Sequence, residues 1–272
     1  MSQVSSTFSA TSGDSYELIM GRWSRRLAGQ FLDFADLTDG GQILDAGCGT
    51  GALTADLLQR TTTAEIVGVD ISEAYVAYAQ AAIQSPRVRF ETGDLTQLIF
   101  ADELFDQVFS QLVLLFVPEA ERAIHELKRV TKAGGLIAAT AWDVSGGLVF
   151  NRIFWDAAAI LDPQAETLRQ RAFTRPLTRP NELAQAWRAA GLTDVRPGEL
   201  TIRTEFSSLD DFWAPFVGGD GPVPAYFRQT APDMQNRIKD AVHRAYLGGD
   251  DDGPRSYAAT AWVVSGRKPV EA

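Results

Sequence analysis

Short apolar runs alternate with helical patterns between Gly41 and about Trp142, and this alternation constrains the fold more than any other feature of the chain. Apolar runs separated by helical segments are typical of a parallel sheet whose strands are joined by crossover helices. The runs are QILDA (42–46), AEIVGVD (64–70), RVRFETGD (87–94), FDQVFSQLVLLFV (105–117) and LIAATAW (136–142). We therefore expect a doubly wound α/β sheet that binds a ligand at the carboxyl ends of its strands.

The pattern is looser after residue 142. We expect helices over 146–161 and 179–192, where apolar residues recur at helical spacing, and late strands over 199–206 and 257–267. The segment SLDDFWAPFVGGDGPVPAYF (208–227) mixes aromatic residues with glycine and proline. Such a mixture favours a loop or lid over a pocket.

Charge and cysteine content exclude several classes of protein. The net charge is −10 and the isoelectric point is about 4.7. An acidic chain is repelled by phosphate backbones and anionic membrane surfaces, so we expect neither nucleic acid nor membrane as a partner. Cys48 is the single cysteine, which excludes an internal disulfide and suits a cytoplasmic location. No apolar run reaches about 18 residues, so we expect no spanning helix.

The stretch ILDAGCGTGALT (43–54) places three glycines at alternate positions after the first apolar run. A backbone without Cβ atoms can approach a ligand closely, and the following helix presents free N–H groups. Gly47, Gly49 and Ala52 match a relaxed dinucleotide-binding pattern, with Asp70 at the expected distance downstream. The glycines alone therefore leave a nicotinamide dinucleotide as one candidate ligand.

Asp45 favours a different ligand. A carboxylate two residues before the first glycine would repel a pyrophosphate in a partly desolvated site. S-adenosylmethionine carries an ammonium and a sulfonium and no phosphate, so the same carboxylate would attract it. The electrostatics thus favour a cationic ligand beside the loop.

The chain resembles the class I S-adenosylmethionine-dependent methyltransferases in five motifs, which occur in the family's order and at its usual spacings. The motifs are ILDAGCGTGALT (43–54), VGVDIS (67–72), FETGDL (90–95), FDQVFSQLVLLFVPE (105–119) and KRVTKAGGLIAATAW (128–142). The flanking segments YELIMGRWSRRLAGQFLDF (16–34) and AATAWVVSGRKP (258–269) resemble the small-molecule branch that includes quinone-ring methyltransferases.

The resemblance implies a Rossmann-like sheet of seven mostly parallel strands with an antiparallel last strand, an N-terminal helical segment and a helical or loop cap. We expect a single domain over 1–272. Its parts are a disordered tail (1–13), an N-terminal helical cap (14–40), a cofactor-binding half (41–142) and a substrate-side half (143–272) with cap or lid insertions at 143–180 and 208–256.

The resemblance also implies roles for individual residues. The loop glycines would pass under the methionyl part of the cofactor, Asp70 would accept hydrogen bonds from the ribose hydroxyls, and Asp94 would recognise the adenine edge. Arg22 would reach the cofactor carboxylate. The full set of expected cofactor contacts is Tyr16, Arg22, Trp23, Asp45, Ala46, Gly47, Cys48, Gly49, Gly51, Asp70, Ile71, Gly93, Asp94, Leu95, Ser110 and Gln111.

Several candidates also have a purely structural interpretation. Aspartates at strand ends commonly cap helices or turns. His125 and His243 lie on helical patterns and are weak candidates for a general base, so we expect no single obligatory catalytic side chain. The basic stretch Arg169, Arg171, Arg175 and Arg179 either holds an anionic substrate group or forms a solvated face.

The sequence therefore predicts a metal-independent methyltransferase of a small, apolar or aromatic acceptor, at oxygen, carbon or nitrogen. Alternatives are an NAD(P)-dependent oxidoreductase and a non-catalytic cofactor-binding protein with the same fold. The acceptor, the attacking atom and the choice between monomer and homodimer stay open.

Overall fold

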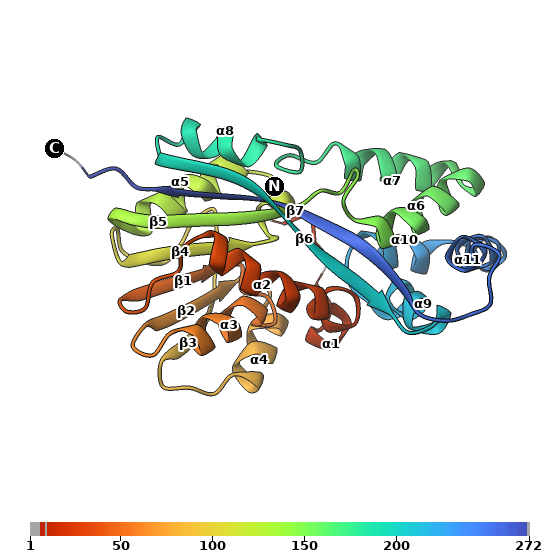
Figure 1. The fold of residues 1–272 in the computed structure, drawn as a ribbon, viewed down its shortest axis with the longest axis horizontal. Helices are drawn as coiled ribbons and strands as arrows, with labels where there is room; N and C mark the ends of the chain where they lie inside the picture. The colour runs from red at the N-terminus through yellow and green to blue at the C-terminus, as the bar shows by residue number, and fades with distance from the viewer. Residues whose placement is uncertain (1–5, 9, 271–272) are drawn as a thin grey trace.

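The computed structural model describes residues 6–8 and 10–270. Within them a seven-stranded sheet runs in the order β3-β2-β1-β4-β5-β7-β6 (Figure 1). Strands β1 to β5 are parallel, and β7 is antiparallel to both of its neighbours. The strands are β1 Gln42–Ala46, β2 Glu65–Asp70, β3 Val88–Thr92, β4 Phe105–Gln111, β5 Thr131–Trp142, β6 Thr193–Phe206 and β7 Arg255–Arg267. The expected α/β fold is confirmed.

Helices cover both faces of the parallel strands because successive residues of each strand point to opposite sides. Ile43 packs with α2 Arg22–Phe34 and α3 Ala52–Arg60, whereas Leu44 packs with α5 Ala120–Val130 and α8 Glu182–Ala189. Helix α4 Glu73–Ala82 packs on β2 and β3, and the short helix η2 Leu114–Phe116 follows β4. Helices on both faces shield the backbone of a parallel sheet from water and leave the ends of its strands accessible.

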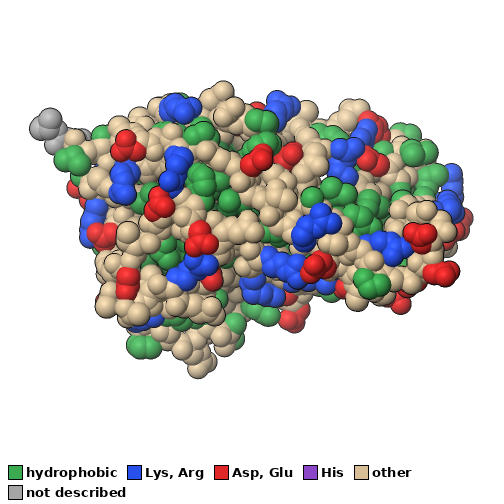
Figure 2. Space-filling view, viewed as in Figure 1, with side chains coloured by type: hydrophobic (Ala, Val, Ile, Leu, Met, Phe, Trp, Pro, Cys, Tyr) green, Lys and Arg blue, Asp and Glu red, His purple; other side chains and the backbone are tan. Residues whose placement is uncertain are grey.

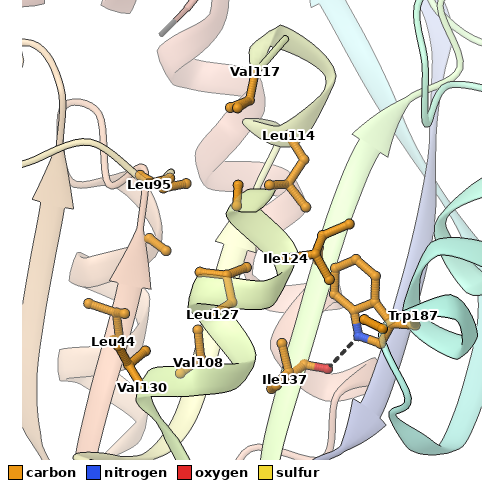
Figure 3. Packing of buried hydrophobic residues seen from close by; sticks show 14 of the residues in the cluster. Leu44, Leu95, Val108, Leu114, Val117, Ile124, Leu127, Val130, Ile137 and Trp187 are labelled. Atoms are coloured by element: carbon orange, nitrogen blue, oxygen red, sulfur yellow. Dashed lines mark hydrogen bonds between the residues drawn. The ribbon is translucent and has the colours of Figure 1, made fainter. Parts of the chain in front are cut away.

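The face under α5 and α8 shows how the sheet is held. Leu127 and Val130 of α5 lie over Val108 of β4, and the fully buried ring of Trp187 lies over β5 (Figure 3). The Trp187 indole N–H donates to the Ile137 carbonyl at 3.1 Å. The Trp187 ring is therefore packed in the core, and its one polar atom has a hydrogen-bond partner there.

A helical cap lies beyond one end of the sheet, at the right of Figure 1. Helices α6 Val149–Leu161 and α7 Pro163–Phe173 follow β5, and α9 Leu209–Gly218, α10 Pro222–Gln229 and α11 Pro232–Leu247 lie between β6 and β7. Phe154, Phe212 and Phe216 are fully buried in one aromatic cluster. The cap has its own hydrophobic core. The long strands β6 and β7 extend from the sheet to this core.

The structure corrects the expectation of a loop over 208–227, because this segment forms α9 and α10. Ser208 caps α9 by accepting a hydrogen bond from the Asp211 N–H. Phe212 and Phe216 then fall on the same helical face and are buried. The glycines after Phe216 only separate the two helices.

The N-terminal segment also differs from the expected disordered tail. Residues 1–5 and 9 of that tail lie outside the described residues. Thr7 donates its N–H to the Phe116 carbonyl at 2.9 Å, and Phe8 contacts the Phe116 ring edge-on at 5.0 Å. The chain then enters α1 Gly13–Tyr16 and η1 Glu17–Gly21, a π-helical turn that continues into α2. The described part of the segment is packed because its few large side chains find partners in the body.

The surface carries both signs of charge on the face seen in Figure 2. Basic side chains gather over α2 and β6 with acidic ones among them, as in the pair of Arg26 and Glu205 at 2.7 Å. No helix among the described residues is long and apolar enough to cross a membrane.

Candidate active site

One large pocket lies at the carboxyl ends of β1, β2, β4 and β5, which are represented in its wall by Gly47, Asp70, Gln111 and Trp142. Residues of the N-terminal segment, such as Phe8, and residues of the cap form the rest of the pocket wall. Its empty space, open mouth included, is about 1280 Å³. Its wall combines a few polar groups at the strand ends with many apolar and aromatic side chains, which is typical of a small-molecule site.

The glycine loop contributes a bare stretch of backbone to this pocket. Gly47 has a φ of 83°, and a Cβ placed on it would lie 2.3 Å from a methyl carbon of Val113. Gly49 has a φ of 53°, and a Cβ there would meet nothing within 4 Å. The first glycine is thus required by packing. The second leaves free space where the loop borders the pocket.

Asp70 at the end of β2 holds the loop in place. Its carboxylate accepts hydrogen bonds from the Gly49 N–H at 3.0 Å and the Ser72 N–H at 2.9 Å. Burial raises its pKa, although these backbone donors oppose the shift. The next residue, Ile71, is 45% exposed within the pocket wall. A carboxylate and an apolar surface therefore stand together beside the loop.

Asp45 lies beneath the loop and not in the pocket wall. It is 1% exposed, and one carboxylate oxygen accepts from the Thr54 hydroxyl at 2.7 Å. The other oxygen is buried without a hydrogen-bond partner among the described residues. Burial raises the pKa of Asp45 to about 7. The hydrogen bonds to its carboxylate therefore do not offset the cost of burying the negative charge.

Burial and the nearby carboxylates raise the pKa of Cys48 well above its ordinary value. The Cys48 thiol is itself buried. A thiol in this setting is a poor nucleophile, because the reactive form is the thiolate. Cys48 is therefore a small loop residue that packs near Phe90 in the structure.

The end of β4 presents an unpaired acceptor. The Ser110 hydroxyl donates to the Ala46 carbonyl at 2.9 Å, and the Gln111 amide donates to the Ser24 carbonyl at 3.1 Å. The Gln111 side-chain oxygen is buried without a partner among the described residues, and Gln111 lines the pocket. Leu112 follows with a φ of 65°, a strained conformation for a leucine.

The N-terminal candidates are placed differently from one another. Tyr16 lines the pocket, its hydroxyl lies 2.9 Å from the Ser24 hydroxyl, and burial raises its pKa to about 12. Arg22 instead forms an ion pair with Asp211 of α9 at 2.9 Å, and its guanidinium lies 4.3 Å from the centre of the Trp23 ring. Neither Arg22 nor Trp23 is in the pocket wall. The pocket wall does not support the expected cofactor contact of either residue, because Arg22 is paired with α9 and Trp23 packs edge-on against Phe206 of β6.

The remaining candidates are not part of the pocket wall. The Gly93 N–H donates to the Asp70 carbonyl at 2.9 Å, and Asp94 accepts from the Thr96 N–H at 2.8 Å. Leu95 is 5% exposed in the core. Six of the sixteen expected contacts lie in the pocket wall: Tyr16, Gly47, Gly49, Asp70, Ile71 and Gln111. The other ten lie outside it: Arg22, Trp23, Asp45, Ala46, Cys48, Gly51, Gly93, Asp94, Leu95 and Ser110.

Neither histidine reaches the pocket wall. His125 lies on the exposed side of α5, and His243 packs edge-on against Trp213 with ring centres 5.2 Å apart. Burial lowers the pKa of His243. In the part of the chain that the structure describes, no group of three or more His, Cys, Asp or Glu residues is arranged to hold a metal ion.

Sequence reasoning missed Asp220, which is 1% exposed and lines the pocket. Its carboxylate accepts from the Tyr75 hydroxyl at 2.8 Å and the Thr11 N–H at 2.8 Å. Burial and this carboxylate raise the pKa of Tyr75. Asp220 therefore ties the N-terminal segment and α4 to the cap. Its only signal was an aspartate in the glycine-rich break GGDG.

Comparison with known proteins agrees with this geometry. Residues 44–139 match the family described as "Methyltransferase domain". A demethylmenaquinone methyltransferase of Roseiflexus sp. is 32% identical over 170 residues, which are 57% of this chain and 69% of that protein. A trans-aconitate 2-methyltransferase of Deinococcus radiodurans is 39% identical over 97 residues, 36% of each chain. The match thus spans about a third of that relative's length.

The fold is shared with a solved structure, phosphoethanolamine N-methyltransferase 2 of Haemonchus contortus in complex with S-adenosylmethionine. The TM-score is 0.60 at 15% identity, and the alignment covers 95% of this chain and 57% of the other. Fold and pocket together define a nucleotide-type ligand site on a doubly wound sheet. The chain belongs to the class I S-adenosylmethionine-dependent methyltransferases.

Proposed function

We propose that the protein transfers a methyl group from S-adenosylmethionine to a small apolar or aromatic acceptor, at oxygen, carbon or nitrogen and without a metal ion. The observation that carries the proposal is that Gly49 and Asp70 line one pocket together with aromatic residues of the cap. Small-molecule sites are lined in this way, mainly by apolar and aromatic side chains with a few polar groups that fix orientation.

The residues around the loop fit this cofactor on two observations. The buried Gln111 side-chain oxygen, which lacks a partner among the described residues and lines the pocket, can accept from the cofactor ammonium, and Asp45 beneath the loop can reach the same group through water. The open space at Gly49 admits a ligand against the backbone. Asp70 would then accept from the ribose hydroxyls and Ile71 would cover one face of the base. A pyrophosphate would place further negative charge near Asp45 and Asp70.

The bound cofactor supplies an activated methyl group on a sulfonium with a good leaving group. The protein has to align the acceptor atom with that methyl group and to exclude water, and such positioning can account for most of the rate. The N-terminal segment serves this purpose, because Phe8 and Tyr16 line the pocket and Asp220 holds the segment down. We infer that no single side chain is obligatory for the chemical step.

Aromatic side chains from the cap support a small apolar or ring-containing acceptor. Trp155 and Phe173 of the cap line the pocket together with Trp142 at the end of β5, Phe116 of η2 and several aliphatic residues. Aromatic side chains of this kind can stack on flat apolar molecules. The curated relatives named above act on different molecules by their names, so the acceptor is proposed from the pocket alone. A cytoplasmic location belongs to the same proposal and is supported by the one free thiol.

The test is a turnover assay with S-adenosylmethionine that carries a labelled methyl group and a panel of phenols, hydroxyquinones, amines and aromatic acids. We expect label to enter at least one acceptor while S-adenosylhomocysteine accumulates. Binding of the cofactor without turnover across the panel would favour a non-catalytic protein. A thermal shift with NADH and none with S-adenosylmethionine would favour the oxidoreductase alternative.

A further inference from the structure

One arginine at the cap side of the pocket has no counter-ion. Arg175 lies between α7 and α8 and lines the pocket, and its guanidinium carbon is 4.8 Å from the centre of the Phe116 ring. Among the described residues its guanidinium makes no hydrogen bond or ion pair. Burial lowers its pKa, and no neighbouring charge opposes that shift. A half-buried cation without a partner is costly, and it would be stabilised by an anion.

The neighbouring arginines are neutralised. Arg152 also lines the pocket, but its guanidinium pairs with Asp156 at 2.9 Å. Arg169 pairs with both Glu166 at 2.8 Å and Asp156 at 3.1 Å. The cap side of the pocket therefore has one uncompensated positive charge, and it belongs to Arg175.

The two carboxylates in the described pocket wall do not compensate it. Asp70 is bound to the backbone N–H of Gly49 at the glycine loop. Asp220 is bound to Tyr75 and to Thr11 of the N-terminal segment. Both carboxylates are thus engaged by other groups, and within the described part of the chain neither of them is a partner of the Arg175 guanidinium.

Two neutral polar side chains that line the same pocket also lack partners among the described residues. Trp142 is 3% exposed, and its indole N–H is buried without an acceptor among the described residues. Asn151 of α6 has a buried side-chain oxygen without a donor. A buried indole N–H almost always finds an acceptor, so a missing acceptor points to a ligand. An indole N–H and a guanidinium are both donors, which suit an anionic oxygen.

We propose that the acceptor carries a carboxylate that binds Arg175 and that the Trp142 indole N–H donates to an oxygen of the same acceptor, whose apolar body lies against the aromatic residues of the pocket wall. One free guanidinium balances one negative charge and offers a planar fork that matches a carboxylate. A phosphate dianion would leave excess negative charge in the pocket. The inference names the substrate class of the proposed methyl-transfer site and rests on that proposed function.

The experiment uses full-length protein saturated with S-adenosylhomocysteine. Calorimetry measures the affinity for benzoate, phenylacetate and 3-phenylpropanoate, each beside its neutral amide and with phenyl phosphate as a further arm. We expect at least one acid to bind about tenfold or more tightly than its amide, the difference of a charge-assisted hydrogen bond. Arg175→Gln should remove this difference and Arg175→Lys should keep part of it, whereas Arg171→Gln, on an exposed arginine of α7, should retain it fully.

Equal binding of acid and amide, or an acid preference that survives Arg175→Gln, would overturn the inference. Absence of binding by all three acids at their highest soluble concentrations, or a preference for phenyl phosphate, would overturn it as well. Affinity for S-adenosylhomocysteine is measured first in every variant and should be unchanged in Arg175→Gln. If the parent protein does not bind S-adenosylhomocysteine, the proposed function fails, and that result is separate from a failure of the Arg175 assignment.

Discussion

The carboxylate of Asp70 accepts a hydrogen bond from the Gly49 N–H at 3.0 Å, which joins the end of β2 to the glycine loop after β1. This contact explains why the loop needs an acidic residue 21 positions downstream. The contact fixes the bare backbone at Gly49 and leaves a carboxylate in the pocket wall for a ligand. A single residue thus shapes the loop and is positioned to bind the cofactor.

Asp70→Ala should weaken the binding of S-adenosylhomocysteine by about 10- to 100-fold, because hydrogen bonds to a charged group are each worth about 1.5–3 kcal/mol. The control is Asp39→Ala. Asp39 likewise accepts from backbone N–H groups, of Thr62 and Thr63, but at the amino-terminal edge of the sheet. Calorimetry on both variants should show loss of affinity only for the first. Equal affinities in the two variants would contradict the ribose assignment.

Asp45→Asn should stabilise the ligand-free protein, and by more at pH 8 than at pH 5. Folding raises the pKa of Asp45 to about 7, whereas an unfolded aspartate ionises near 4. Between these values the folded state holds a proton that the unfolded state has lost, so the contribution of Asp45 to stability falls as pH rises from about 4 to 7. We expect a gain on the order of 1–3 kcal/mol at pH 8.

Urea unfolding at the two pH values measures this gain as a difference from the parent. The same variant should bind S-adenosylhomocysteine more weakly, since the ligand ammonium would lose its ionised partner. In the parent, affinity should rise as pH increases through about 7. A variant that is less stable than the parent at pH 8 would refute an uncompensated charge at Asp45.

Asp220→Asn should loosen the N-terminal segment. One carboxylate oxygen accepts from the Thr11 N–H and the Tyr75 hydroxyl, and the other accepts from the Thr11 hydroxyl. An amide has only one acceptor oxygen, so one of these two positions loses its acceptor. We expect faster hydrogen exchange in peptides that cover residues 6–16 and a higher KM for the cofactor. The matched control is Asp250→Asn at an exposed turn. Exchange rates equal to those of the control would show that Asp220 does not hold the segment.

Arg22→Gln should leave the affinity for S-adenosylhomocysteine unchanged within about twofold. In the structure this guanidinium pairs with Asp211 of the cap and lies outside the pocket wall. The pair is about one-third exposed, so its loss should cost only about 0.5–1 kcal/mol of stability. Asp211→Asn should give a similar loss. A large drop in cofactor affinity for Arg22→Gln alone would restore the sequence hypothesis that Arg22 reaches the cofactor.

The sheet could be predicted from the sequence because buried parallel strands are short apolar runs and each ends on a motif residue. Gly47, Gly49 and Asp70 were found for the same reason, since they directly follow strands. The cap could not be predicted in this way. Its helices α9 and α10 are rich in glycine, proline and aromatic residues, and only their burial in a shared aromatic cluster makes them helical.

The same limit applies to the site residues from distant segments. Asp220 meets Thr11 across 209 positions, and Arg22 meets Asp211 across 189. Nothing local in the sequence signals contacts of this range. Arg175 was one of four arginines in a basic stretch, and only the packing of α6 and α7 distinguishes it by leaving it without a counter-ion.

Calorimetric titration of the folded parent protein with S-adenosylhomocysteine tests the central claim most directly. We expect saturable binding at one site per chain, with affinity that falls in Asp70→Ala and is retained in Asp39→Ala. The absence of detectable heat or of any thermal stabilisation by the ligand, in protein shown to be folded by circular dichroism, would contradict it.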